Sequence, residues 1–349
     1  MKFYACPKCE GRIYFENLMC LQCGAQLGYL PSQRCMADVS ESSRAAGFSV
    51  CANRSALLCN WLVEVTDTAA APEPALLCVS CQHTRTIPPQ DAPPHQSALQ
   101  KLEQAKRYLF YSLIGLNLPI PRCNSDSERG LVFDFLVQLP GHAPITTGHA
   151  SGVITINAAE ADDAKREQKR VLLNEPYRTV LGHLRHEIGH YYWDLLVSNT
   201  PYLESFRRLF GDERIDYAQS LQTHYETADQ RNWQGRYISH YASSHPWEDW
   251  AETWAHYLHI GDAMETAAAW GVLLADHAQS ISMSDFWGDE FRERLVKDWL
   301  PLSQYLNAAC RSLGEPDAYP FILPDMVLDK LSFVHEVIRS AASDKQSGG

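Results

Sequence analysis

The fold is decided by the stretch Arg185-His186-Glu187-Ile188-Gly189-His190-Tyr191-Tyr192-Trp193-Asp194. Pro176 predicts the start of a helix that runs from about Tyr177 to Val197 and contains this stretch. His186 and His190 are four residues apart, so on a helix both imidazoles project from one face and can reach the same metal ion. The HExxH pattern is therefore a candidate zinc site.

Glu187 lies beside that face, where its carboxylate can take a proton from a metal-bound water. Zinc lowers the pKa of such a water to about 7, so hydroxide becomes available at neutral pH. Gly189 lets a neighbouring strand or a substrate come close to the helix. A pattern with three fixed positions also recurs by chance on helix surfaces. A further ligand is therefore needed to distinguish a metal site from a chance match.

A second helix offers that ligand. Pro246 stands in the first turn of a helix predicted from about His245 to Ile260, which carries carboxylates at Glu248 and Glu252. Glu248 could complete a His-His-Glu site, and Glu252, one turn later, could orient a ligand histidine. An acidic helix N-terminus in solvent is the alternative. The neighbouring residues are too apolar for a surface helix, and they are Trp247, Trp250, Ala251 and Trp254.

Three other acids remain open as the third ligand. Asp194 lies one turn past His190 on the same helix, where it more naturally supports a ligand than binds the metal. Glu213 follows a Gly-Asp turn and could pair with an arginine such as Arg185. Glu252 is the third.

Tyr241 lies seven residues before Glu248. A phenol at this place could donate to the oxyanion of a tetrahedral intermediate. Ordinary core packing is the alternative for one tyrosine among 16.

Nine of the 11 cysteines precede residue 82. In a chain that begins without an apolar secretory run, such clustering favours metal thiolate sites over disulfides. Two CxxC pairs predict a tetrahedral Zn²⁺ site formed by Cys6, Cys9, Cys20 and Cys23. A second structural zinc is predicted at Cys51, Cys59, Cys78 and Cys81, with His83 as a substitute for one thiolate. We interpret Cys35, Cys123 and Cys310 as buried thiols outside any metal site.

Composition divides the chain into four parts. Residues 1–86 are Cys-rich with short β-like runs and predict a small zinc-ribbon-like domain. Residues 87–96 are Pro-rich and predict an extended linker. Residues 97–340 predict a mainly helical domain that opens with a helix from Ser97 to about Leu116, and 341–349 predict a disordered tail. The expected fold class is α+β.

Two strands are expected to interrupt the helical part, at Leu131–Val137 and at Gly152–Asn157. The second is interpreted as an edge strand, which could hold an extended peptide by backbone pairing. A purely structural strand is the alternative.

The net charge is −12, and residues 1–95 carry only 7 Lys/Arg against 8 Asp/Glu. Neither part has the basic footprint of a nucleic-acid binder. No stretch approaches the roughly 18 to 20 apolar residues of a membrane helix, and the N-terminus lacks a secretory signal. We therefore expect a soluble, cytoplasmic protein with neither nucleic acid nor membrane as a partner.

The C-terminal two-thirds of the chain resembles the gluzincin class of zinc metallopeptidases, in which a Glu from a later helix joins the HExxH helix. The resemblance is closest to a bacterial family of zinc-binding metallopeptidases with an N-terminal zinc ribbon, and it spans essentially the whole chain. The residues that carry it are 185–194, 210–214 and 248–253, together with 152–157, 159–162 and 319–321.

The spacing from Tyr241 to Glu248 also looks like the lethal-factor branch of gluzincins, where a tyrosine at this distance faces the zinc. The resemblance implies a mainly helical, zincin-like fold for residues 97–340. It also implies that Glu248, rather than Glu252, is the third ligand.

We expect a zinc-dependent metallopeptidase that acts on a peptide or protein. It would hold one catalytic zinc at His186, His190 and Glu248, and one or two structural zinc ions. Glu187 would be the general base, and Tyr241 would stabilise the oxyanion. Two alternatives stay open: a zinc-stabilised protein-binding or regulatory module with a vestigial HExxH site, and a protease acting on DNA-bound proteins.

Overall fold

The chain forms two compact units of different secondary structure. The computed structural model describes residues 2–39, 47–65, 76–89, 93–123, 130–172, 175–226, 233–274 and 280–347. The first unit comprises Met1–Leu173 with Thr179–Leu181, and the second comprises Asn174–Arg178 with Gly182–Gly349.

Three small antiparallel sheets form the N-terminal part of the first unit. They pair β1 (Phe3–Ala5) with β2 (Arg12–Tyr14), β3 (Leu27–Leu30) with β4 (Cys35–Asp38), and β5 (Phe48–Val50) with β6 (Leu62–Glu64). Two short helices, α2 (Arg54–Leu57) and the 3-10 turn η1 (Cys81–His83), complete this part. Aromatic rings fill its centre, since Tyr29 lies 5.3 Å from Trp61 and 4.9 Å from Phe15 between ring centroids.

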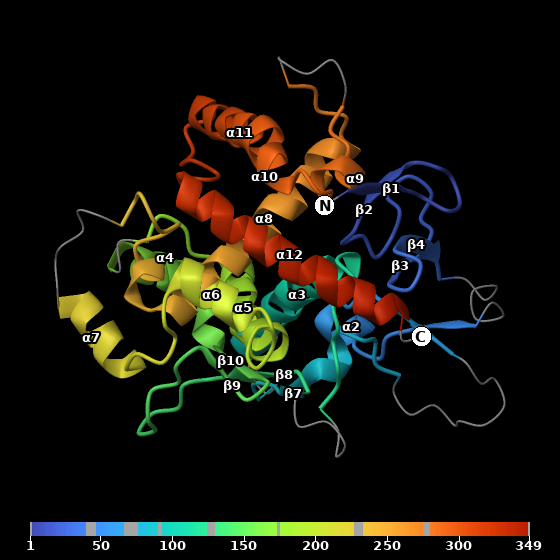
Figure 1. Ribbon diagram of the computed structural model, residues 1–349. Coiled ribbons are helices and arrows are strands. Elements are labelled where there is room, and N and C mark those ends of the chain that lie inside the picture. The colour runs from blue at the N-terminus through green and yellow to red at the C-terminus, as the bar shows by residue number, and fades with distance from the viewer. Residues whose placement is uncertain are drawn as a thin grey trace. The chain divides into compact units, whose positions relative to one another are not determined.

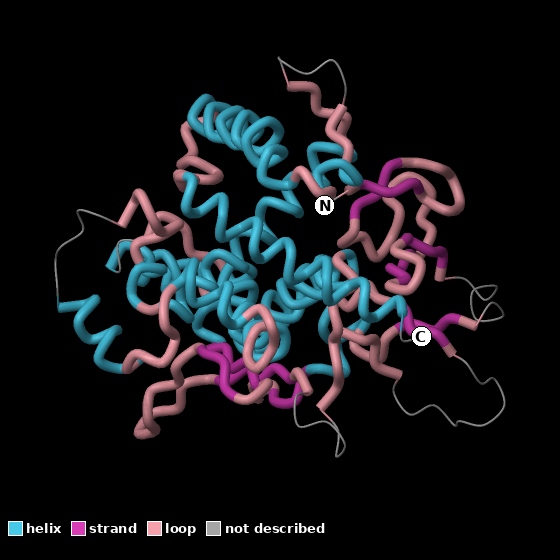
Figure 2. The backbone as a smooth tube through the Cα atoms, viewed as in Figure 1, coloured by secondary structure: helices cyan, strands magenta, loops and turns pink. Residues whose placement is uncertain are grey.

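A four-stranded sheet forms the rest of the strand structure, drawn in magenta in Figure 2. Its order is β7 (Thr84–Thr86), β8 (Val132–Leu136), β10 (Val153–Asn157) and β9 (Gly148–Ala150). Strand β8 is parallel to β7 and β10, whereas β9 runs antiparallel to β10.

The expectation that 152–157 is an edge strand is wrong, because β10 lies between β8 and β9. The chain reverses between β9 and β10 at Ser151 and Gly152, which have φ of 48° and 82°. Two positive φ values are what a two-residue hairpin turn requires, and this turn places β9 over the edge that β10 would otherwise expose.

The helix expected from Ser97 begins earlier in the chain than predicted. It is α3 (Pro93–Gly115), so it begins inside the predicted linker 87–96, of which 90–92 lie outside the described residues. Proline is tolerated in the first turn of a helix, where its missing N–H costs no hydrogen bond. The four-stranded sheet joins residues on both sides of the linker, because β7 pairs with β8.

All regular secondary structure in the described residues of the second unit is helical. Its long helices are α5 (Val180–Leu196), which begins in the last residues of the first unit, α8 (Pro246–Ala269) and α12 (Asp325–Ser347). Shorter ones are α6 (Leu203–Phe210), α7 (Tyr217–Glu226), the 3-10 turn η3 (Tyr241–Ser244), α9 (Met283–Phe286), α10 (Phe291–Arg294), the π-helical turn η4 (Leu295–Trp299) and α11 (Leu300–Ser312). Helix α12 packs on α6, α8 and α10 (Figure 1). The first unit contains two further helical elements, η2 (Ala158–Ala161) and α4 (Asp163–Leu172).

The predicted disordered tail 341–349 is helical as far as Ser347, and the last two residues lie outside the described part of the chain. Residues 340–347 contain neither proline nor glycine, so nothing in them ends the helix before Gly348. The helices and small sheets together confirm the expected α+β fold class.

A buried ion pair joins α12 to the first turn of α8. Lys330 Nζ lies 2.6 Å from Asp249 Oδ2 and donates to the carbonyl oxygen of Arg236 at 2.7 Å. It also lies 4.4 Å from the centre of the Tyr237 ring. Because Lys330 and Asp249 are both almost fully buried, each charge depends on the other. The pair therefore fixes the start of α8 and the segment before η3.

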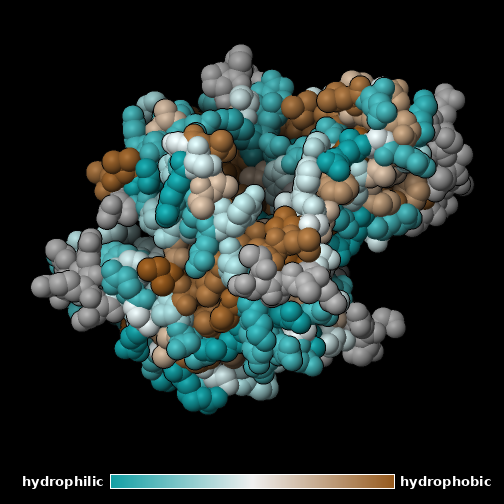
Figure 3. Space-filling model, turned by 90° about the horizontal axis from the view of Figure 1, so that it is seen from above, coloured by the Kyte–Doolittle hydropathy of each residue, from teal (hydrophilic) through white to brown (hydrophobic). Residues whose placement is uncertain are grey.

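Among the described residues, no helix is long and apolar enough to cross a bilayer. On the face shown in Figure 3, hydrophilic residues predominate and the hydrophobic ones gather in several patches. Isolated apolar patches of this kind are ordinary on a folded protein.

Candidate active site

Helices α5 and α8 cross at Gly189 with almost no space between them. A Cβ atom at Gly189 would lie 3.0 Å from Ala251 Cα and 3.1 Å from Trp254 Cβ. The indole Nε1 of Trp250 donates to the carbonyl oxygen of Gly189 at 2.8 Å. The glycine of the HExxH stretch thus allows the close crossing that brings the side chains of the two helices together.

Three candidate ligands converge at this crossing. His186 Nε2 lies 3.2 Å from His190 Nε2. Glu248 Oε2 lies 2.9 Å from the first of these nitrogens and 3.5 Å from the second. Glu248 is only 1 % exposed, and its Oε2 makes no hydrogen bond within the described part of the chain.

This donor set suits zinc. Two imidazole nitrogens and one carboxylate oxygen are the ligands of many catalytic zinc sites, which leave a fourth position open. A buried carboxylate oxygen without a hydrogen bond is costly unless a cation balances it. The residues present therefore fit a zinc ion held by His186, His190 and Glu248.

Hydrogen bonds to neighbouring side chains orient two of these ligands. His186 Nδ1 donates to Glu252 Oε1 at 2.8 Å, which leaves the Nε2 lone pair directed toward the centre. Ser239 Oγ donates to the other oxygen of Glu252 at 2.7 Å. Tyr217 OH donates to Glu248 Oε1 at 2.7 Å. Sequence reasoning expected the part played by Glu252 but missed Tyr217 and Ser239.

Glu187 and Tyr241 lie beside the convergent ligands. Glu187 is 8 % exposed, and burial raises the pKa of its carboxyl, although the imidazoles of His186 and His190 oppose the shift. The Tyr241 ring lies 5.9 Å from the His186 ring. Burial raises the pKa of Tyr241 well above its usual value, and the charge of Glu248 adds to the effect. Tyr241 is therefore a neutral phenol that can donate a hydrogen bond.

The other acids considered as ligands lie elsewhere. Neither Asp194 nor Glu213 belongs to the described groups of side chains that converge on one point. Glu213 pairs with Arg207 at 2.6 Å rather than with Arg185, because Arg207 precedes it by six residues at the end of α6. Arg185 instead pairs with Asp262 on α8.

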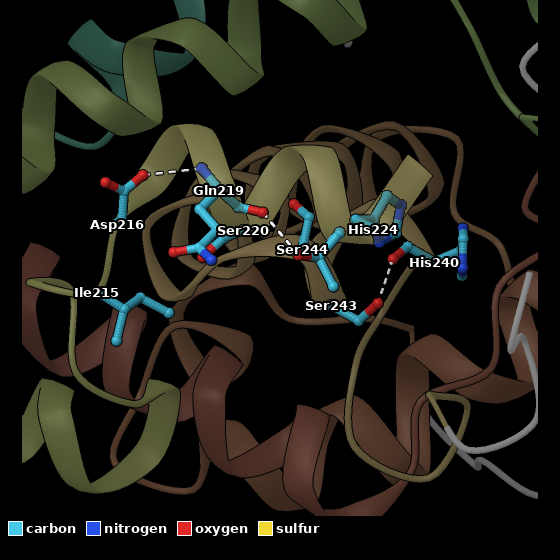
Figure 4. Close-up of a pocket in the computed structure, with 9 residues that line it drawn as sticks. Ile215, Asp216, Gln219, Ser220, His224, His240, Ser243 and Ser244 are labelled. Atoms are coloured by element: carbon cyan, nitrogen blue, oxygen red, sulfur yellow. Dashed lines mark hydrogen bonds between the residues drawn. The ribbon is translucent and has the colours of Figure 1, made fainter. Parts of the chain in front are cut away.

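A polar pocket of about 450 Å³ lies between α7 and η3 (Figure 4). These two elements carry Tyr217 and Tyr241, so an occupant of the pocket would contact both elements. The His224 and His240 rings lie 4.3 Å apart, and burial lowers the pKa of both. The lining residues are Ile215, Asp216, Gln219, Ser220, Thr223, His224, His240, Ser243 and Ser244.

The cysteines form two groups of four in the first unit. In the first group, Sγ atoms lie 3.8 Å apart for Cys6 and Cys23, and 3.7 Å apart for Cys9 and Cys20. In the second, Cys59 Sγ lies 3.7 Å from Cys78 Sγ and 3.8 Å from Cys81 Sγ. The second group also contains Cys51, and all four of its members are buried. Four thiolates in such a group suit tetrahedral zinc.

The remaining cysteines and His83 lie outside these groups. The four cysteines of the second group converge without His83, so it does not replace a thiolate there. Its Nδ1 lies 2.7 Å from the carbonyl oxygen of Val79. The interpretation of Cys123 as buried is wrong, since it is exposed, and Cys35 and Cys310 are half-buried. Each of these three lacks a nearby cysteine partner in the sequence pattern, and burial cannot be read from a lone cysteine.

The chain matches two family models and is similar to proteins of two mycobacterial species. Residues 95–337 match the family model described as "Putative zinc-binding metallo-peptidase", and residues 3–92 match a zinc-ribbon domain. Uncharacterized proteins of Mycobacterium bovis and Mycobacterium tuberculosis are each 42 % identical to the chain over 345 residues, which is 99 % of this chain and 97 % of the relative. No solved structure matches. The chain belongs to the zinc-binding metallopeptidase family that the first model describes, and a zinc-ribbon domain precedes the family's region.

Proposed function

We propose that the chain hydrolyses peptide bonds at the centre formed by His186, His190 and Glu248. The observation that carries this proposal is the convergence of their three ligand atoms within 4.8 Å of one another, with Glu187 buried beside them. A zinc ion held there would supply the Lewis acidity that activates water and polarises a carbonyl group.

The chain's own side chains divide the remaining tasks. Glu187 takes a proton from the attacking water and passes it to the leaving amine. Burial raises its pKa above that of an ordinary carboxyl, which favours a group that must both accept and release a proton. Tyr241 donates to the carbonyl oxygen as negative charge develops there. Glu252 and Tyr217 keep His186 and Glu248 in position.

The substitution Glu187→Gln tests the proposal. It keeps the shape of the side chain and all three ligands, so the purified variant should retain its zinc. Peptide hydrolysis should fall by about 10² to 10⁴-fold, the usual contribution of a general base. A peptide library digested by each protein and analysed by mass spectrometry measures the loss and also reports the cleavage preference.

Glu204→Gln is the matched control, because Glu204 is exposed and pairs only with Arg207 in the described structure. This variant should cleave like the parent. Undiminished hydrolysis by Glu187→Gln would refute the role of Glu187. A parent protein that binds zinc at the three ligands but cleaves no peptide in the library would refute the proposed function itself.

A further inference from the structure

A second pocket, in the first unit, lies between α3 and two loops of the Cys-rich part. It has a volume of about 250 Å³. We call it the α3 pocket, and its lining residues are Phe15, Glu16, Leu18, Leu57, Leu58, Asn60, Ser97, Gln100, Lys101, Gln104 and Arg107. The pocket is lined by both charged and apolar side chains.

Arg107 is the unusual member of this lining. It is only 4 % exposed, and its Nη2 donates to the carbonyl oxygen of Leu58 at 3.4 Å. Its Nη1 is buried and has no hydrogen-bond partner among the residues that the structure describes. No carboxylate of the described residues forms an ion pair with it. A buried guanidinium without an anion is costly, so within the described part of the chain this positive charge lacks a carboxylate partner.

The other charged groups of the pocket are already engaged. Lys101 Nζ lies 2.9 Å from Asp163 Oδ2 and 3.2 Å from the carbonyl oxygen of Ala161. Glu16 is exposed, and one of its carboxylate oxygens accepts from Tyr108 OH. Arg107 is thus the one cation of the described lining that has no anionic partner. Glu16 adds negative charge at the exposed edge of the pocket.

This balance of charge favours a singly charged ligand over a doubly charged one. A carboxylate matches the planar fork of one guanidinium, whereas a phosphate would carry a second charge toward Glu16. Apolar side chains lie beside Arg107 in the pocket: Phe15, Leu18 and Leu57, with Leu58 half-exposed at 50 %. Gln104 and Asn60 also line the pocket, and the Nδ2 of Asn60 donates to the carbonyl oxygen of Phe15. The Gln104 amide suits the polar groups of a peptide backbone.

We propose that the α3 pocket binds the C-terminal carboxylate of a peptide that ends in an apolar residue, with Arg107 as the carboxylate-binding side chain. The last side chain of the peptide packs against Phe15, Leu18 and Leu57. This binding site does not rest on the proposed function, since none of its residues belongs to the zinc centre.

Calorimetric titration of the full-length chain tests the proposal. The Glu187→Gln background is used so that hydrolysis does not consume the peptide. The probes are an acetylated tripeptide ending in leucine with a free carboxylate, the same peptide with a C-terminal amide, and acetyl-leucine alone. The free acid should bind at least about tenfold more tightly than the amide, because only the acid forms charge-assisted hydrogen bonds. Acetyl-leucine binding as tightly as the tripeptide would overturn the assignment to a peptide.

Arg107→Met should remove the discrimination between acid and amide. Arg170→Met is the matched control, because Arg170 lies on α4 and pairs with Glu167 outside the pocket. It should bind both peptides like the parent. Without peptide, Arg107→Met should raise the melting temperature, since it removes an unpaired buried charge.

Two further outcomes would overturn the proposal. If Arg107→Met lowers the melting temperature and releases zinc, Arg107 neutralises the thiolates near Cys59 rather than binding a ligand. If the parent does not bind the acid, and Glu16→Gln lowers the melting temperature but does bind it, Glu16 is the internal partner of Arg107 in solution. The proposal expects Glu16→Gln to bind the acid as tightly as the parent or more tightly.

Discussion

Tyr217 holds one oxygen of Glu248 while the other oxygen faces the two imidazoles. Burial raises the pKa of Tyr217, and the charge of Glu248 adds to the shift, so the phenol stays protonated and always donates. A hydrogen bond to the outer oxygen of a ligating carboxylate limits its rotation and tunes its strength as a ligand. Tyr217 is therefore a positioning residue for the zinc centre.

Tyr217→Phe removes this hydrogen bond and keeps the ring. Zinc affinity at the centre should fall by about tenfold, the lower end of what such supporting partners contribute. Competition with a chromophoric chelator measures the affinity. Tyr225→Phe is the control, because Tyr225 lies on the same helix but is exposed. Equal zinc affinity in Tyr217→Phe and the parent would show that Tyr217 does not support the ligand.

The sequence predicts the positions of some residues of the site but not of others. His186 and His190 are four residues apart on one helix, and Glu248 lies among tryptophans, so local spacing and composition predicted that these three meet. Tyr217 lies 31 residues before Glu248, and Ser239 lies 13 residues before Glu252. No periodicity links such pairs, because the turns between α7 and α8 bring them together.

At the scale of elements, the start of α8 was predicted better than its end. Pro246 predicted the start of α8 within one residue, but the helix runs to Ala269 rather than to Ile260. Gly261 looks like a helix end in the sequence. In the fold it is a place of close packing, since a Cβ there would lie 2.6 Å from an atom of the Trp287 ring. A tertiary contact therefore keeps the glycine inside the helix.

Helices α8 and α12 are also joined through His335. Its Nδ1 lies 2.9 Å from Tyr257 OH, and its Nε2 donates to the carbonyl oxygen of Gly288 at 3.2 Å. Burial, together with the charge of Arg339, lowers the pKa of His335 to about 4, although the hydrogen bond to Gly288 and the charge of Asp289 oppose the shift. The unfolded chain binds a proton here below about pH 6.5, whereas the folded chain does so only near pH 4.

The fold should therefore lose stability as the pH falls from about 6.5 toward 4, because the unfolded state gains the proton first. Between pH 7 and pH 5, His335 should contribute up to about 2 kcal/mol of this loss. Urea unfolding of the parent and of His335→Gln at both pH values measures it. The variant should lose less stability than the parent over this range. An equal loss in both proteins would mean that His335 is not buried in its neutral form.

For the whole molecule, the three groups of convergent ligands predict one zinc ion each. Metal analysis of the purified chain should find about three zinc ions, since each group supplies a donor set that suits zinc. A chelator should remove the ion at His186, His190 and Glu248 without unfolding the chain, because an open catalytic site adds little to the fold. Removal from the cysteine groups should unfold the Cys-rich part.

Single-residue variants distinguish the zinc ion at the three-ligand centre from those at the cysteine groups. His190→Ala should lower the zinc content by one and leave the far-ultraviolet circular dichroism unchanged. Cys78→Ser should also lower it by one but should destabilise the first unit. A zinc content that His190→Ala does not change would contradict a metal site at the crossing of α5 and α8.

Only part of the arrangement of the whole molecule could be predicted from the sequence. Cysteine spacing predicted the Cys-rich part, and helical periodicity predicted the helical part. The pairing of β7 with β8 was not predictable, because it joins residues separated by a proline-rich stretch and a long helix. The internal position of β10 was missed for a similar reason, since β9 is only three residues long and has no strand-like composition.

His186 lies between two carboxylates that stand one turn apart on α8: its Nδ1 donates to Glu252, and its Nε2 lies 2.9 Å from Glu248 Oε2. A one-residue insertion or deletion between positions 248 and 252 would rotate Glu252 by about 100° around the helix relative to Glu248. One of the two contacts would then be lost, whatever residue was added or removed. The three residues between these acids can thus exchange type wherever packing allows, but their number cannot change while both contacts persist.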